Sequence, residues 1–225
     1  MSAEERKREA AEAALTLLPE SGVIGLGTGS TAKPFIEGVA RLVKAGRQLV
    51  GVPTSAQSQA LASSLGIPLL GDDGPWDIDV TVDGADEVSA DLQVIKGGGA
   101  CHLREKIVNQ ASRRNLIIVD ESKLSQRLGE RWPVPVEVVQ FGHLTTARHL
   151  AAIGQATLRQ RDGAPVRTDS GHLIYDVAVG PIESPSDLDR ALRQIPGVVE
   201  TGLFIDRVQR VIVAGIGGVR QLQRP

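Results

Sequence analysis

Apolar positions along this chain follow two spacings, one typical of helices and one typical of buried strands. Within residues 4–18, apolar side chains recur at the i, i+3, i+4, i+7 spacing of an amphipathic helix. A short apolar run follows at 23–26 and ends in glycines, which favours a buried strand. The alternation predicts further helices at 32–44, 56–65 and 103–113, and further strands at 48–52, 67–70, 78–82, 92–95 and 116–119. This order is typical of a mostly parallel sheet covered on both faces.

The pattern changes near residue 131, where an extended, proline-marked segment begins. The elements expected beyond it alternate as strand, helix, strand, strand, helix, strand, which is typical of a ferredoxin-like α+β unit. An apolar run at 207–214 is expected to rejoin the first sheet. We therefore predict an α/β protein: a Rossmann-like domain of residues 1–130 plus 202–225, and a smaller ferredoxin-like domain of residues 131–201. The helices of the smaller domain are expected at 145–153 and 186–194, and its later strands at 156–161, 173–177 and 198–201.

Composition narrows the functional classes. The 225 residues are 41% hydrophobic and include 25 glycines, enough for a sizeable core. Twenty-five basic and 27 acidic residues give a net charge of −2, too balanced for nucleic-acid binding, and aromatic residues for base stacking make up only 3%. A single cysteine excludes an internal disulfide framework. The charged amino terminus and short apolar runs predict a cytoplasmic protein that does not bind membranes.

Residues 27–31, Gly-Thr-Gly-Ser-Thr, lie between a predicted strand and a predicted helix. Unpaired backbone N–H groups and the positive helix end make such a loop an anion site. A dinucleotide fingerprint would need glycine in place of Ser30 and an acid after the 48–52 strand, and the Walker A pattern lacks its lysine. The loop therefore favours a small phosphate ester, although a glycine turn with a Ser/Thr helix cap is the structural alternative.

Three carboxylates, Asp83, Asp86 and Glu87, stand at the carboxyl end of a predicted strand, the edge where open α/β sheets bind ligands. Crowded carboxylates raise one another's pKa, which can give one protonated acid beside one ionised base. A divalent metal site with oxygen ligands and a solvated helix-capping turn are equally compatible with this motif.

Lys96 and the glycines at 97–99 form the most specific local motif. Three consecutive glycines are costly to order, so we expect them to supply backbone donors to an oxyanion, with Lys96 adding positive charge. Glu105 follows in the opening turns of the next helix and could be aimed back over the ligand, although such charged triplets usually face solvent. Cys101 and His102 are adjacent and not expected to pair, and a turn is the favoured interpretation of the glycines at 215–218.

These four motifs, residues 27–31, 83–87, 96–99 and 104–106, stand in the order and spacing of type A ribose-5-phosphate isomerases, which the chain resembles over nearly its whole length. The resemblance implies interconversion of ribose 5-phosphate and ribulose 5-phosphate in the pentose phosphate pathway, without a metal or organic cofactor. Members of the family are usually homodimers and sometimes tetramers, so a homodimer is expected here. It implies Glu105 as general base, with Asp83, Asp86 and Lys96 as further catalytic groups. The substrate contacts implied are Thr28, Gly29, Ser30, Thr31, Asp83, Gly84, Ala85, Asp86, Lys96, Gly97, Gly98, Gly99 and Lys123.

The matched functional positions are all present, and the mild departure is Cys101-His102, where small and aliphatic residues are more usual. Two alternatives come from other classes. A sugar-phosphate sensor on the same fold would bind ligand without catalysis, although the two expected domains leave no room for a DNA-binding segment. An acyl or CoA transferase would use a glutamate nucleophile, which nothing in the sequence demands.

Overall fold

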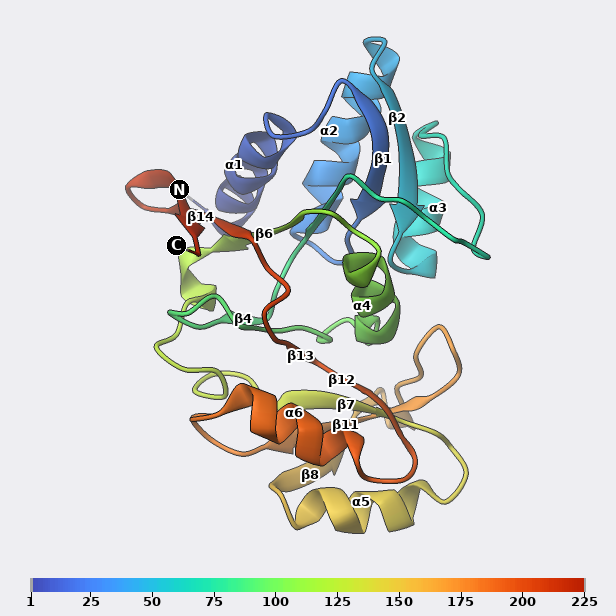
Figure 1. The fold of residues 1–225 in the computed structure, drawn as a ribbon, viewed down its shortest axis with the longest axis vertical. Helices are drawn as coiled ribbons and strands as arrows, with labels where there is room; N and C mark the ends of the chain where they lie inside the picture. Colours follow the sequence, from blue (N-terminus) through green and yellow to red (C-terminus); the bar gives the residue numbers. More distant parts are fainter. Residues whose placement is uncertain (1, 225) are drawn as a thin grey trace. The chain divides into compact units, whose positions relative to one another are not determined.

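The computed structural model describes residues 2–224, which divide into two compact units (Figure 1). The first unit contains residues up to 85, residues 104–123 and residues from 207 onward; the second contains 86–103 and 124–206. The domain boundaries expected at 131 and 201 both lie inside the second unit. The difference arises because 86–103 and 202–206 supply strands that pair with each other rather than with the large sheet.

A six-stranded sheet forms the centre of the first unit, in the order β15-β14-β6-β3-β1-β2. All neighbouring strands are parallel except the hairpin of β14 and β15. The five parallel strands have the doubly wound order 2-1-3-4-5 when numbered along the unit, which confirms the predicted mostly parallel α/β sheet. The strands are β1 (Ser21–Leu26), β2 (Gln48–Pro53), β3 (Val80–Asp83), β6 (Asn115–Asp120), β14 (Arg210–Gly215) and β15 (Gly218–Gln223).

Two sequence expectations fail or change in this sheet. The strand predicted at 67–70 is wrong: only Leu69 forms an isolated bridge, to Gly51, and the neighbouring Pro68 has no N–H with which to extend a ladder. The strand β15 was not expected, because its largely polar sequence lacks a buried run. The glycines at 215–218 lie where β14 turns into β15, which confirms the interpretation as a turn.

Helices cover both faces of this sheet. They are α1 (Ala3–Leu15), α2 (Ala32–Lys44), α3 (Ala56–Ser64) and α4 (His102–Gln110). On one face, side chains of α1, α2 and α3 pack with Ile24 and Leu26 of β1 in the main core. On the other face, Val108 of α4 packs with Val52 of β2 and with Ile78. The carboxyl-terminal end of α4 leads directly toward the start of β6.

The second unit has the predicted ferredoxin-like arrangement. Its four-stranded antiparallel sheet has the order β12-β7-β11-β8, with α5 between β7 and β8 and α6 between β11 and β12. The core joins side chains of this sheet to Ile95 and Leu203 of a small three-stranded sheet. The elements are β4 (Glu87–Val88), β5 (Val94–Ile95), β7 (Val134–Val138), α5 (His143–Ala151), β8 (Gln155–Leu158), β9 (Gln160–Arg161), β10 (Ala164–Pro165), β11 (Leu173–Ala178), α6 (Pro185–Arg193), β12 (Val198–Thr201) and β13 (Leu203–Phe204), with the 3-10 turn η1 (Glu121–Lys123) in the first unit.

Within residues 2–224, every helix falls short of the length and apolar character needed to cross a bilayer.

Candidate active site

Three neighbouring strands of the first unit, β6, β3 and β1, end at the same edge of the sheet. The predicted residues follow these ends: Asp83 is the last residue of β3, the glycine loop (residues 27–31) follows β1, and Lys123 closes η1 directly after β6. The chain order reverses between β1 and β3, and such a switch point is where doubly wound sheets bind ligands. The topology therefore brings the first unit's predicted residues to one edge.

Asp83 organises the start of the glycine loop. Its Oδ1 accepts hydrogen bonds from the N–H groups of Thr28 (3.0 Å) and Gly84 (2.7 Å), and the residue is only 3% exposed. The Gly27 N–H donates to the carbonyl of Val82 at 3.0 Å. A Cβ at Gly27 would overlap the Asp83 carboxylate, so glycine is required there by close packing. The loop and the carboxylate are thus one connected structure.

The Thr28 hydroxyl joins two residues that the sequence interpretation missed. Its Oγ1 lies 2.7 Å from Thr54 Oγ1 and 2.8 Å from Ser55 Oγ, both at the end of β2. A signal was available, since Thr54 and Ser55 follow a strand adjacent to β1 and precede α3. By contrast, Gly29 and Ser30 lie exposed at the loop tip, and the Thr31 side chain makes no capping bond to α2.

Glu105 lies in the first turn of α4 and is 6% exposed, so the solvated-face interpretation is wrong. Val108 follows one turn later on the same side of the helix and is buried with Val52, near the end of β2. Beyond its carboxyl-terminal end, α4 is followed by Arg113, whose N–H bonds to the carbonyl of Ile78, ahead of β3. The helix therefore runs against the strands, and its first turn, with Glu105, lies toward their carboxyl ends.

Lys123 lies beside an acidic partner, Asp120. Burial raises the pKa of the Asp120 carboxyl, but hydrogen bonds from the Ser122 N–H (2.9 Å) and hydroxyl, with the charges of Lys123 and Arg6, lower it more strongly. The net pKa of Asp120 lies below its usual value of 3.8. Asp120 is therefore held as an anion close to the Lys123 ammonium.

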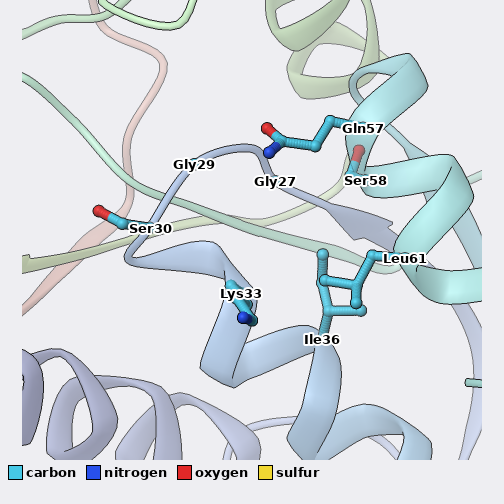
Figure 2. A pocket seen from close by; sticks show the side chains of 8 residues that line it. All are labelled: Gly27, Gly29, Ser30, Lys33, Ile36, Gln57, Ser58 and Leu61. Carbon is cyan, nitrogen blue, oxygen red and sulfur yellow. The ribbon is translucent and has the colours of Figure 1, made fainter.

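A cavity of about 440 Å³ adjoins the glycine loop on the side of α2 and α3. Figure 2 shows Ile36 and Leu61 side by side on one wall, with the backbone of Gly27 and Gly29 passing above them. The cavity is lined by Gly27, Gly29, Ser30, Lys33, Ile36, Gln57, Ser58 and Leu61. Neither Asp83 nor Glu105 lines it, so the cavity borders the loop without containing the predicted acids.

In the second unit, Asp86 and the triple-glycine loop (residues 96–99) are bonded to each other. The Gly98 N–H donates to Asp86 Oδ2 at 2.7 Å, and the Asp86 N–H donates to the carbonyl of Ile95 at 2.9 Å. The Gly98 amide, expected to face an oxyanion, here bonds the carboxylate. A Cβ at Gly98 would come within 2.6 Å of Asp86 Oδ1. Glycine is therefore needed for the loop to approach this acid.

Lys96 is 4% exposed, and its Nζ lies 5.6 Å from the centre of the Phe204 ring. At this distance the ring face attracts the ammonium. The Lys96 N–H donates to the carbonyl of Gly202 at 2.9 Å, which fixes the start of the loop on the strand side. The Lys96 ammonium is therefore a positive charge that is largely excluded from solvent.

Glu87, Cys101 and His102 have structural surroundings. Glu87 is fully buried and accepts from the Ser125 hydroxyl (2.7 Å) and two backbone N–H groups, at 129 and 131, so the alternative of a solvated helix-capping turn is wrong for this residue. The Cys101 thiol donates to the Gly99 carbonyl at 3.2 Å, and buried His102 lies 3.9 Å from Glu137. Among residues 2–224, no three His, Cys, Asp or Glu side chains gather in a way that could hold a metal ion.

Comparison with known proteins decides the family. Residues 50–218 match the family model described as ribose 5-phosphate isomerase A (phosphoriboisomerase A). The chain belongs to the ribose-5-phosphate isomerase A family. It is 46% identical to the ribose-5-phosphate isomerase A of Desulfatibacillum aliphaticivorans, and the match covers 96% of each chain. It is 47% identical to the ribose-5-phosphate isomerase A of Parvibaculum lavamentivorans, and that match covers 95% of each chain.

Solved structures of ribose-5-phosphate isomerases agree with this membership. A D-ribose-5-phosphate isomerase in complex with phospho-erythronic acid superposes with a TM-score of 0.96, at 41% identity over the whole of both chains. Ribose 5-phosphate isomerase A from Methanocaldococcus jannaschii superposes with a TM-score of 0.93, at 40% identity over 99% of this chain and 100% of its own.

Proposed function

We propose that the chain interconverts ribose 5-phosphate and ribulose 5-phosphate by proton transfer through an enediolate, with Glu105 as the base. The observation that supports this reaction is membership of the ribose-5-phosphate isomerase A family. The burial of Glu105 in the first turn of α4 supports its role, because a desolvated carboxylate held on a rigid element is suited to repeated proton transfer.

The reaction needs one base that moves a proton between neighbouring carbons. Glu105 takes the proton from C2 of the open-chain aldose, the C2–H electrons form the enediolate double bond, and the O1 oxyanion develops. The same carboxyl then returns the proton to C1, and the O2 hydroxyl proton passes to O1, so that the C2=O bond and the C1 hydroxymethyl group of the ketose form. A positioned base of this kind contributes roughly 10²–10⁴-fold to the rate.

Charge and ring chemistry fall to the other proposed residues. Lys96 supplies a fixed positive charge for the enediolate oxygen, together with backbone N–H groups of the triple-glycine loop. Asp83 opens the cyclic sugar by shuttling a proton between ring oxygen and hydroxyl, and Asp86 assists it. The proposed substrate contacts extend through Gly84, Ala85 and Gly97 to Gly99.

The glycine loop and Lys123 are proposed to bind the phosphate. The loop precedes α2 and presents backbone N–H groups at a positive helix end, and Thr31 adds a hydroxyl that does not cap the helix. A relative was solved with phospho-erythronic acid, a small phosphorylated acid, which supports a ligand of this class. We further propose a cytoplasmic homodimer without metal or organic cofactor. The homodimer and the absence of a cofactor rest on the family resemblance, and the cytoplasmic location rests on the charged amino terminus and the short apolar runs.

The test measures isomerisation and solvent-deuterium incorporation into ribulose 5-phosphate, after treatment of the protein with a chelator. We expect full activity after chelation and a loss of roughly 10²–10⁴-fold in kcat for Glu105→Gln. Glu12→Gln, on the exposed side of α1, is the matched control and should keep the wild-type rate. Normal turnover by Glu105→Gln would refute the base; ligand binding without deuterium incorporation by the unaltered chain would refute the isomerase.

A further inference from the structure

Arg159, between β8 and β9, is a largely buried cation that none of the sequence motifs contains; its side chain is 15% exposed. Its guanidinium is held by Asp176 of β11: Nε donates to Oδ2 at 2.9 Å, and Nη2 donates to Oδ1. This two-pronged pairing fixes the plane of the guanidinium, as only arginine can. The remaining prong, Nη1, is thereby aimed in one direction.

The aimed prong contacts the backbone of the triple-glycine loop. Arg159 Nη1 donates to the carbonyl of Gly97 at 2.6 Å and to that of Gly98 at 3.2 Å. Four donor contacts of the guanidinium are therefore made within the second unit, two to Asp176 and two to the loop. This geometry makes Arg159 a residue that acts on the loop.

The peptide group between Gly97 and Gly98 is held at both ends. Its C=O accepts from Arg159, and its N–H donates to Asp86 Oδ2 at 2.7 Å. The C=O and N–H of a trans peptide point in opposite directions, so one plane links the guanidinium to the carboxylate. In such a chain the hydrogen bonds polarise one another, and each strengthens the next.

Glycine makes this arrangement possible and also leaves it undetermined. Gly97 has a φ of +112°, which side chains rarely adopt, and a Cβ at Gly98 would lie 2.6 Å from Asp86 Oδ1. Within the loop the Ala100 N–H also donates to the Gly97 carbonyl, at 2.9 Å, but glycine populates many backbone orientations at similar energy, so this single turn bond holds the peptide only weakly. Arg159 adds two charge-assisted hydrogen bonds from outside the loop, to the Gly97 and Gly98 carbonyls, and these strengthen the observed orientation of the peptide.

We propose that Arg159, held by Asp176, is a positioning residue that orients the Gly97–Gly98 peptide and through it the Asp86 carboxylate. The inference rests on the proposed function, in which Asp86 assists the opening and closing of the sugar ring. Loss of Arg159 should therefore impair ring chemistry more than proton transfer by Glu105.

Two assays separate these steps. Ribulose 5-phosphate is an open-chain ketose, and deuterium exchange at its C1 requires only the base and the enediolate. Net conversion of ribose 5-phosphate also requires the ring to open. For Arg159→Ala we expect kcat for ribose 5-phosphate to fall up to roughly 10²-fold further than the rate of deuterium exchange, the loss that a misplaced catalytic group can produce. Arg159→Lys keeps the positive charge but lacks the planar guanidinium. Its ratio of kcat to the rate of deuterium exchange should therefore lie between the ratio of Arg159→Ala and that of the unaltered chain.

The matched control is Arg193→Ala. Arg193 is also paired with an acid of the same unit, since its Nε donates to Asp189 at 2.7 Å. It belongs to α6, and none of the hydrogen bonds described for the triple-glycine loop comes from it. It should lower the unfolding temperature without changing the ratio of the two rates. Should Arg159→Ala fail to fold, Arg159→Lys and Asp176→Asn carry the same ratio test.

Equal falls in the two rates for the folded Arg159 and Asp176 variants would overturn the inference, because a merely structural role lowers both together. An unchanged ratio with normal rates would overturn it as well. Failure of the proposed function is seen separately: the unaltered chain would then incorporate no deuterium and convert no ribose 5-phosphate.

Discussion

The role of a carboxylate in this chain depends on the donors around it rather than on its motif. Asp83 and Glu87 stand four positions apart in one acidic segment, yet they have different partners. Asp83 accepts hydrogen bonds from the N–H groups of Thr28 and Gly84, whereas Glu87 accepts hydrogen bonds from residues of the 125–131 segment. Asp120 is a third case, because its neighbour Ser122 donates twice to it. Each acid is therefore assigned by its partners.

Asp120 gives a prediction about acid stability. Its pKa in the folded chain is lowered, so the ionised form stabilises the fold above the unfolded pKa, and this contribution is lost as the pH falls through the folded pKa. Asp120→Asn should be less stable than the unaltered chain at neutral pH, and the difference should shrink below about pH 4. Urea unfolding across this pH range measures it; a difference independent of pH would contradict the assignment.

At the scale of elements, α1 and α2 pack closely because one position lacks a side chain. Gly38 is buried within α2, and a Cβ there would overlap the end of the Leu15 side chain on α1. Glycine inside a helix costs roughly 0.5–1 kcal/mol relative to alanine. The close approach of the two helices therefore outweighs the helix-forming preference at this position.

Gly38→Ala should destabilise the chain despite the better helix former. Overpacking of a buried contact costs about 1–3 kcal/mol, which exceeds the gain in helix propensity. Leu15→Ala in the same chain removes the overlapping atoms, so the double variant should be more stable than the sum of the two single effects. Denaturant unfolding of the unaltered chain, the two single variants and the double variant gives the double-mutant cycle. Additive changes in the free energy of unfolding would show that the helices do not contact each other at these residues.

At the scale of the whole molecule, the second unit is built from separate stretches of chain. Its core includes Ile95 from the 86–103 stretch and Leu203 from β13, beside the four-stranded sheet. The contiguous βαββαβ stretch that the sequence indicates therefore lacks part of its own core. This explains why periodicity alone located the motif but placed the unit's limits too narrowly.

A fragment of residues 131–201 should consequently unfold at lower denaturant than one of residues 124–206. The longer fragment keeps Leu128 and Leu203, both buried in this core, whereas the shorter one leaves cavities in their place. Each lost large aliphatic side chain costs about 2–5 kcal/mol. Far-ultraviolet circular dichroism in urea compares the two; equal midpoints would place the core inside 131–201.

Local patterns predicted much of this molecule and long-range pairing accounts for what they missed. The helix expected at 32–44 has the observed bounds of α2, and the loop after β1 and Asp83 lie at one sheet edge as predicted. The strands β4 and β13 have two residues each, too few for any periodicity to register, whereas β5 lies within the strand expected at 92–95. Arg159 could not be predicted because its partners, at 97, 98 and 176, are distant in sequence.

The isolated bridge between Gly51 and Leu69 has a consequence for self-association. Gly51 lies on β2, the outermost parallel strand, and directs both its backbone groups to the 68–70 segment: its N–H donates to Pro68 at 2.8 Å, and its C=O accepts from Leu70 at 3.0 Å. An edge strand with unpaired N–H and C=O groups can form backbone hydrogen bonds with a strand of a second chain. A second chain would first have to displace the 68–70 segment, so this segment protects the β2 edge of the sheet from intermolecular strand pairing.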